Sequence, residues 1–138
     1  WWDSTLLILV ADHGSRHPGA SPIHVPEKFH IPMIWLGGAL NQTDTIICKV
    51  LNQSDKPTLI CDQLGISNSE FTFGKDVLTG SSEFAIYAYN NGYGFVTENE
   101  QFTYDLESSK LSDSEVCDSI VMQSQAFLQT LLHDFNQK

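Results

Sequence analysis

The feature that most constrains this chain is an apolar run that ends abruptly on polar residues. Residues 6–11 are all apolar, and Asp12, His13 and Gly14 follow them directly. A segment that is apolar at every position is typical of a strand buried on both faces, as in the parallel sheet of an α/β protein. Ligands bind outside the carboxyl ends of such strands. We therefore expect Asp12 and His13 to stand at a functional site.

The charge of the chain excludes one large class of partners. The formal net charge is −10, and Lys and Arg together number only 7 and do not cluster. Nucleic-acid backbones are bound by grouped basic side chains. We therefore expect no nucleic-acid partner, and the dispersed acidic residues indicate a solvated surface.

The three cysteines, Cys48, Cys61 and Cys117, are widely spaced and form no Cys-x-x-Cys or Cys-x-x-His pair. This spacing excludes a zinc ribbon. The apolar neighbours of these cysteines favour small buried thiols over nucleophiles. One disulfide bond between two of the cysteines is the alternative.

A loop rich in Gly, Pro and His follows the first strand, over residues 14–26. We expect it to bring His17, His24 and His30 near Asp12 and His13, because sites are usually built on loops at strand ends. Residues 31–36 then predict a second buried strand.

The middle of the chain predicts a short helix. Ser54 or Asp55 can cap it, Pro57 fits its first turn, and Gly65 supplies the left-handed stop. Residues 41–51 fit either a short strand or an extended crossing, and the sequence does not choose between them.

Residues 84–89 and 93–97 flank a turn at residues 90–92, which predicts a β-hairpin. Alternation over residues 102–106 adds a third strand to an antiparallel meander. The aromatic side chains here fit cross-strand core packing better than a ligand-stacking surface.

The end of the chain predicts a long amphipathic helix. Ser112 and Glu115 have the spacing of a capping box. An apolar stripe at three- and four-residue steps then indicates about six turns that cover one face of the sheet. Its members are Val116, Ile120, Phe127, Leu128, Leu131, Leu132 and Phe135.

Adjacent acid and imidazole side chains at a strand end suit a metal ion, because Gly14 permits a sharp turn that lets both face one ion. The oxygen of Asp12 and the nitrogen of His13 favour Mn²⁺, Zn²⁺ or Fe over Ca²⁺ and Mg²⁺, which prefer all-oxygen ligands. The Asp-His-Gly tripeptide by itself is also an ordinary turn sequence, so the apolar strand before it and the His-rich loop after it carry the prediction.

Several stretches together give the chain a family resemblance. The stretches are residues 3–14, 29–36, 52–66, 71–78 and 84–95, and Asp-His-Gly is the most specific piece among them. On these stretches the chain resembles the C-terminal part of a sulfatase-family protein of the alkaline phosphatase superfamily. More narrowly, it resembles the lipoteichoic acid synthase-like and phosphoethanolamine transferase-like branch.

The resemblance implies an α/β chain that forms the C-terminal part of an alkaline phosphatase-like fold, with buried parallel strands, a small antiparallel meander and a long C-terminal helix. Residues 1–138 would form a single domain. Its first part, residues 1–80, would hold the metal-site strands, the loop and the short helix. Its second part, residues 81–138, would hold the hairpin meander and the C-terminal helix.

The activity implied is that of a metal-dependent sulfatase or phosphotransferase acting on sulfate or phosphate esters, lipid- or glycan-linked ones included. A Thr, Ser or formylglycine nucleophile would attack the ester beside the metal. Asp12 and His13 would be metal ligands, with Mn²⁺ or Zn²⁺ favoured over Ca²⁺ or Mg²⁺. Calcium-dependent sulfatases tend to have Asn at the position of His13, so the phospho-transfer branch fits better.

Two further loop residues are candidates for contact with the substrate. Arg16 offers a bidentate guanidinium for a phosphate or sulfate oxygen. His17 is a candidate for contact with the ester oxygens or the leaving group, and thus for a catalytic role. His24 and His30 are expected to be structural, hydrogen-bonded imidazoles.

The resemblance also implies that the nucleophile and the other metal carboxylate lie before Trp1. We therefore expect a soluble, inactive fragment that binds metal weakly, from a membrane-anchored parent with an extracytoplasmic catalytic domain. An unpaired edge on the first strand predicts a homodimer or a domain-swapped assembly.

A second hypothesis is a non-catalytic binding or assembly module. It would use the free sheet edge and the aromatic hairpin, where Tyr87, Tyr89, Tyr93 and Phe95 surround one turn.

Overall fold

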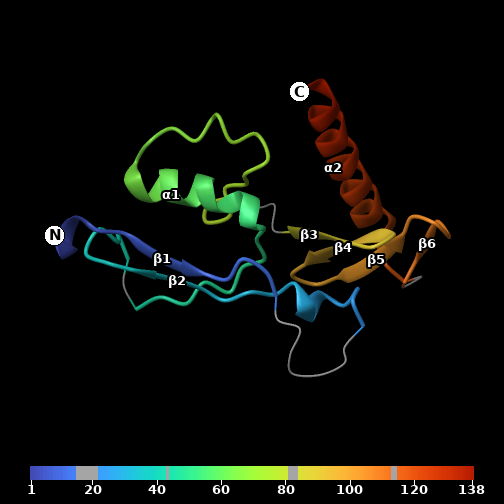
Figure 1. The fold of residues 1–138 in the computed structure, drawn as a ribbon, viewed down its shortest axis with the longest axis horizontal. Coiled ribbons are helices and arrows are strands. Elements are labelled where there is room, and N and C mark those ends of the chain that lie inside the picture. The colour runs from blue at the N-terminus through green and yellow to red at the C-terminus, as the bar shows by residue number, and fades with distance from the viewer. Residues whose placement is uncertain (15–21, 43, 81–83, 113–114) are drawn as a thin grey trace.

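The computed structural model describes residues 1–14, 22–42, 44–80, 84–112 and 115–138. The regular elements of this part of the chain are two sheets, two α-helices and short 3₁₀ turns (Figure 1). The strands are β1 (Leu7–Val10), β2 (Met33–Leu36), β3 (Phe84–Tyr89), β4 (Gly92–Thr97), β5 (Gln101–Asp105) and β6 (Lys110–Leu111). The helices are α1 (Lys56–Leu64), α2 (Asp118–Gln137) and the 3₁₀ turns η1 (Trp2–Ser4), η2 (Pro26–Lys28) and η3 (Gln53–Asp55).

The first two strands form an antiparallel ribbon, and the prediction of buried parallel strands is wrong. Leu7 pairs with Leu36 and Val10 with Met33, so β2 runs back alongside β1. Leu7, Leu9 and Val10 are exposed, and β2 is the one strand paired with β1 among the described residues. A continuous apolar run predicts a strand, but it does not fix the direction of the neighbouring strand or what covers its faces.

Helix α1 confirms the prediction for the middle of the chain. Pro57 lies in its first turn, and Gly65 ends it in the left-handed region, with φ 66°. The carboxylate of Asp55 does not cap α1; it accepts a hydrogen bond from the backbone N–H of Asn52. Residues 44–51, which the sequence left open, form no strand.

The second sheet is the predicted meander with one added strand, in the order β3-β4-β5-β6. The register places Ile86 opposite Phe95, and Phe95 opposite Phe102. Because paired residues share one face of an antiparallel sheet, these side chains point to the same side. Phe84, Tyr93, Phe95 and Phe102 on this face form the buried core cluster of the described residues.

Helix α2 covers that aromatic face. Phe127 meets Phe84 edge to face, with 5.1 Å between ring centroids. The buried hydroxyl of Ser124 donates to the carbonyl of Val121, so the hydroxyl of Tyr93, 3.1 Å away, donates to Ser124. The C-terminal half of α2 extends away from the sheet (Figure 1), and Leu131, Leu132 and Phe135 are exposed there. The predicted stripe therefore packs over its first half only.

The predicted start of α2 is wrong. The helix begins at Asp118, and Cys117 precedes it without a capping hydrogen bond from its side chain. Ser112 instead extends the sheet, because its hydroxyl accepts the backbone N–H of Thr103 and its own N–H donates to the Thr103 carbonyl. The sequence thus has the spacing of a capping box, but Ser112 bonds to the sheet and not to the first turn of a helix.

The segment around η2 packs on the opposite face of the meander. Phe29 stacks on Tyr87 with 4.1 Å between ring centroids, and the Tyr87 hydroxyl donates to the His24 carbonyl at 2.7 Å. Burial, with smaller contributions from nearby Tyr89 and Glu27, raises the pKa of Tyr87 to about 12. The ring of Tyr87 lies across Gly94, where a Cβ would overlap it, so glycine in this strand makes room for the aromatic side chain.

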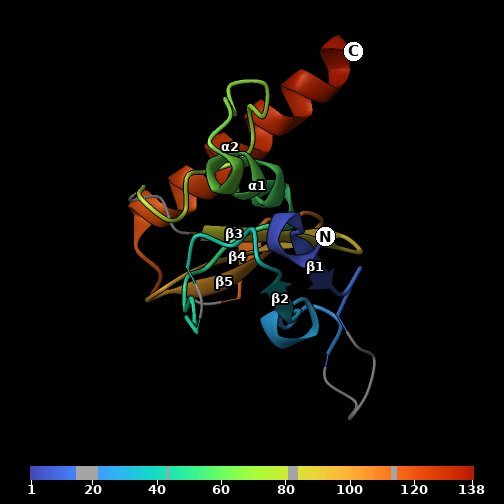
Figure 2. The same ribbon diagram turned by 90° about the vertical axis from the view of Figure 1, so that its left-hand side faces the viewer.

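The helices and the η2 segment thus lie on opposite sides of the strands. Figure 2 shows α1 and α2 on one side of β3, β4 and β5, with the light-blue η2 segment on the other. The fold is an α/β arrangement with an antiparallel meander and a long C-terminal helix, as predicted. No helix in the described ranges has the length and apolar character needed to cross a membrane.

Candidate metal centre

Asp12 and His13 stand just beyond the end of β1, as the sequence predicts. Both side chains are open to solvent, with exposed fractions of 87% for Asp12 and 79% for His13. The strand ends at Val10, so both residues have left the ladder of β1 and β2. Because both side chains are exposed and neither residue pairs with β2, both side chains are accessible to a ligand.

The two side chains present their donor atoms to the same region. Asp12 Oδ1 lies 3.5 Å from His13 Nε2, and it also accepts the backbone N–H of His13 at 2.9 Å. His13 Nδ1 lies 2.9 Å from the carbonyl oxygen of Gly14. A carbonyl can only accept, so Nδ1 carries the proton, and in the neutral imidazole Nε2 keeps its lone pair.

This donor pair fits a divalent metal ion. Two ligands bound at about 2.1 Å to one tetrahedral ion lie about 3.4 Å apart, close to the 3.5 Å between Asp12 Oδ1 and His13 Nε2. The imidazole also has the arrangement common in metal sites, where the distal ring N–H donates to a carbonyl. Asp12 and His13 would therefore hold the ion.

Within the described residues, the candidate site consists of these two side chains alone. The described residues contain no group of three or more His, Cys, Asp or Glu side chains able to hold a metal ion. His24 and His30 therefore do not join Asp12 and His13 in a metal-holding group among the described residues. His24 lies beside Tyr89 at a centroid distance of 6.0 Å, and His30 is exposed. Arg16 and His17 lie outside the described residues.

Asp12, His13 and Gly14 form a corner of the chain just beyond β1. A close backbone contact requires glycine at position 14 of this corner. A Cβ on Gly14 would overlap the carbonyl oxygen of Lys28, at the end of η2. The chain therefore passes directly against the η2 segment immediately after His13. The glycine of Asp-His-Gly serves here to let two backbone segments pack together, in addition to permitting the turn.

A glutamine that the sequence interpretation missed also contacts the corner. Gln53 Nε2 donates to the backbone carbonyl of Asp12 at 2.8 Å, across 41 positions of sequence. Gln53 Oε1 accepts the ammonium of Lys56 at 2.7 Å. Nothing in the sequence pattern around Gln53 signals this long-range contact.

Next to Gln53 is a buried polar network, also missed. The Asp55 carboxylate is fully buried and accepts the Lys75 ammonium at 2.8 Å and the Asn52 N–H at 2.7 Å. Asn52 Oδ1 accepts the N–H of Ile86 at 2.9 Å. The network thus joins η3, the Lys75 segment and β3. Asp55 stands between Ser54 and Lys56, so the sequence around it gives no signal of its burial.

The cysteines fit the expectation only in part. Cys61 is buried, but Cys48 and Cys117 are exposed, and all three thiols are free. Hydrogen bonds from Ser119 lower the pKa of Cys117. None of the three belongs to a metal-holding group in the described part of the chain.

The aromatic residues of the hairpin do not form one surface. Tyr93 and Phe95 are buried under α2, whereas Tyr87 pairs with Gly94 and points to the opposite face, toward η2. The prediction of core packing is confirmed for Tyr93 and Phe95, while Tyr87 and Tyr89 are half-buried outside that core cluster. The single aromatic binding surface of the second hypothesis does not form.

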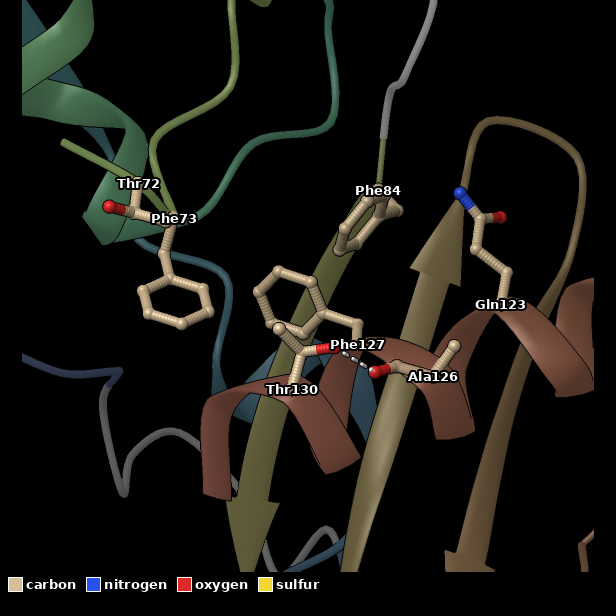
Figure 3. Close-up of a pocket in the computed structure, with 7 residues that line it drawn as sticks. All are labelled: Thr72, Phe73, Phe84, Gln123, Ala126, Phe127 and Thr130. Carbon is tan, nitrogen blue, oxygen red and sulfur yellow. Dashed lines mark hydrogen bonds between the residues drawn. The ribbon is translucent and has the colours of Figure 1, made fainter. Parts of the chain in front are cut away.

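One hollow lies between α2 and the segment that precedes β3, with a volume of about 340 Å³. Figure 3 shows the rings of Phe73, Phe84 and Phe127 facing it, and the Thr130 hydroxyl turned back to the carbonyl of Ala126. Its lining has no titratable side chain, so it offers no acid–base group. The residues that line it are Thr72, Phe73, Phe84, Gln123, Ala126, Phe127 and Thr130.

Comparison with known proteins supports the superfamily that the sequence resembles. No model of a known protein family matches the chain. The fold is similar to the crystal structure of a protein in the alkaline phosphatase superfamily from Vibrio parahaemolyticus, with a TM-score of 0.63 and 25% sequence identity. The match covers 94% of this chain and 36% of that one, so the chain spans about a third of its relative's length. The similarity extends to the superfamily and does not distinguish its branches.

Proposed function

We propose that this chain contributes part of the metal site of an enzyme that transfers phosphoryl or sulfuryl groups, within the alkaline phosphatase superfamily. The observation that carries the proposal is the 3.5 Å separation of Asp12 Oδ1 and His13 Nε2 at the end of β1. It occurs in a chain that is similar in fold to a protein of this superfamily. Asp12 and His13 are the proposed ligands.

The chemistry follows from the donor set. A divalent ion at such a site neutralises charge on the ester oxygens and lowers the pKa of a nucleophile. His13 contributes a neutral nitrogen fixed in its tautomer by the Gly14 carbonyl, and Asp12 contributes a carboxylate oxygen. This mixed set favours Mn²⁺ or Zn²⁺ over Ca²⁺ or Mg²⁺.

The remaining parts of the proposed site come from outside the described residues. Two ligands leave positions on the ion for further donors and for the ester. We place the nucleophile and at least one more carboxylate elsewhere in the polypeptide that carries this sequence. Arg16 and His17 are proposed to contact the ester oxygens.

The finer features of the proposed activity rest on the sequence resemblance. It favours a phosphoryl transferase of the lipoteichoic acid synthase-like and phosphoethanolamine transferase-like branch over a calcium-dependent sulfatase. The substrate would then be a phosphate ester carried on a lipid or glycan, and the protein would be membrane-anchored with an extracytoplasmic catalytic domain.

The test is Asp12→Ala in the full-length polypeptide that contains this sequence, assayed with 4-nitrophenyl phosphate and 4-nitrophenyl sulfate in the presence of MnCl₂ or ZnCl₂. We expect turnover to fall at least about 100-fold. Mutating even a residue that hydrogen-bonds to a metal ligand typically lowers activity about 10–100-fold, and Asp12 is a proposed ligand itself. The control is Asp3→Ala, an exposed carboxylate in η1. Equal turnover in wild type and Asp12→Ala would refute the ligand assignment.

A further inference from the structure

The backbone carbonyl of Asp12 obtains its hydrogen bond from outside its own ribbon. β1 ends at Val10, so Asp12 lies beyond the last residue that pairs with β2. Its carbonyl oxygen accepts Gln53 Nε2 at 2.8 Å. Because the side chains of Asp12 and His13 are mostly exposed, their own packing does little to hold this corner in place.

The Gln53 amide is itself oriented by a neighbour. The Lys56 ammonium lies 2.7 Å from Gln53 Oε1, and an ammonium group can only donate hydrogen bonds. The oxygen therefore faces Lys56 and the amide N–H₂ faces Asp12, which is the only orientation that satisfies both contacts. The Gln53 side chain thus links the Asp12 carbonyl to Lys56 in one fixed orientation.

The turn that carries Gln53 is anchored by buried groups on its two sides. Asn52 donates its N–H to Asp55 Oδ2 at 2.7 Å and accepts the N–H of Ile86 at 2.9 Å. Asp55 also receives the N–H and the ammonium of Lys75. Buried, satisfied polar networks of this kind hold their members in one arrangement. Gln53 therefore joins the Asp12 corner to a rigid part of the molecule.

We infer that Gln53 is a positioning residue for the Asp12 and His13 pair, holding the two proposed metal ligands in one arrangement through the Asp12 carbonyl. This inference rests on the proposed function. Its role is to reduce the freedom of the ligands before the metal binds, as supporting hydrogen bonds do in other metal sites.

The chain contains a matched control for this role. Gln63, near the C-terminal end of α1, donates its Nε2 to the Ala39 carbonyl at 2.7 Å, whereas Gln53 lies in η3, just before α1. This is the same kind of bond, from a side-chain amide to a backbone carbonyl, and it ties the C-terminal end of α1 to the chain just after β2. Gln63 makes no contact with Asp12 or His13 among its hydrogen bonds in the structure.

The experiment compares Gln53→Met and Gln63→Met in the whole chain, since Met keeps the length of Gln without its amide. MnCl₂ is titrated into ¹⁵N-labelled protein, and paramagnetic broadening near His13 reports binding. We expect the dissociation constant to rise about tenfold in Gln53→Met and to stay within twofold of wild type in Gln63→Met. Equal constants in the two variants would overturn the inference.

A second readout needs no metal. The order parameter of the His13 backbone amide should fall in Gln53→Met and not in Gln63→Met, because that amide belongs to the corner held by Gln53. An unchanged order parameter would count against the positioning role even if no metal bound.

Asp12→Asn in the same titration separates the two proposals. If Asp12→Asn binds Mn²⁺ as wild type does, the proposed function fails. If Asp12→Asn loses binding while Gln53→Met retains wild-type affinity and order, the ligand assignment stands and only the positioning role of Gln53 fails.

Discussion

At the scale of single residues, the Asp12 and His13 corner is held by backbone contacts. The Gly14 carbonyl fixes the tautomer of His13, Gln53 holds the Asp12 carbonyl, and the Cα of Gly14 passes against Lys28. The side chains themselves face solvent. The corner therefore keeps its donor atoms accessible while its backbone is fixed from two sides.

Gly14→Ala tests the close contact with η2. The new Cβ would overlap the Lys28 carbonyl, and backbone has to move to relieve it. Overpacking of this kind costs about 1–3 kcal/mol, so we expect the free energy of unfolding in urea to fall by that amount. A change below about 0.5 kcal/mol, the usual range for surface substitutions, would contradict the packing role of Gly14.

Lys75→Met tests the buried ion pair. The Asp55 carboxylate has no exposed surface and the Lys75 side chain is only 11% exposed, so removing the ammonium leaves a buried charge without its partner. Breaking such a pair costs about 3–5 kcal/mol, and we expect a loss of unfolding free energy in that range by urea titration.

The matched control for that change is Lys138→Met. Lys138 pairs with Asp134 at 2.9 Å on the open surface of α2. Exposed pairs contribute about 0–1 kcal/mol, so this variant should unfold nearly as wild type does. Equal losses in the two variants would show that the burial of Asp55 and Lys75 does not set the strength of their pair.

At the scale of elements, the η2 segment docks on the meander through Tyr87, and we expect this contact to depend on pH. Burial raises the pKa of Tyr87 to about 12 from 10.0. A group whose pKa is higher in the folded state stabilises the fold fully below its unfolded pKa, and this contribution is lost as pH rises through the folded value. Stability should therefore decline between about pH 10 and 12.

Tyr87→Phe isolates that contribution. It removes the titrating hydroxyl and its bond to the His24 carbonyl, at a cost of about 1 kcal/mol at pH 7. The decline in unfolding free energy from pH 10 to 12 should be shallower in the variant than in wild type. Identical slopes, measured by chemical unfolding at each pH, would show that Tyr87 does not titrate differently in the folded state.

The sequence predicts those elements whose signals are local. The hairpin turn at Asn90 and Asn91, the alternation in β5 and the Gly65 stop of α1 all depend on neighbouring residues, and the structure confirms them. The position of Asp12 and His13 just beyond a strand is also a local signal and is confirmed, whereas their role as metal ligands stays a prediction.

What the sequence did not predict depends on partners far along the chain. The direction of β2 relative to β1, the exposure of β1 and the use of Ser112 by Thr103 are set by tertiary contacts. The Gln53 bond to Asp12 spans 41 positions. Local propensity carries no information on such pairs.

At the scale of the whole molecule, the chain corresponds to 36% of the length of the Vibrio parahaemolyticus protein that it resembles in fold. Its β1 and β2 ribbon exposes apolar side chains, among them Leu9 and Ile34. The homodimer or domain-swapped assembly expected from the strand edge stays a prediction. Light scattering of the chain at high concentration checks it, and a monomer under those conditions would contradict it.

The most direct test of the central claim is an anomalous-scattering map of crystals grown with ZnCl₂ or MnCl₂, from the full-length polypeptide that carries this sequence. The account predicts one strong peak bonded at about 2.0–2.2 Å to both an Asp12 carboxylate oxygen and His13 Nε2. Further ligands to the same peak would come from residues outside those described here. A peak held by other residues, with Asp12 and His13 free, would contradict the claim.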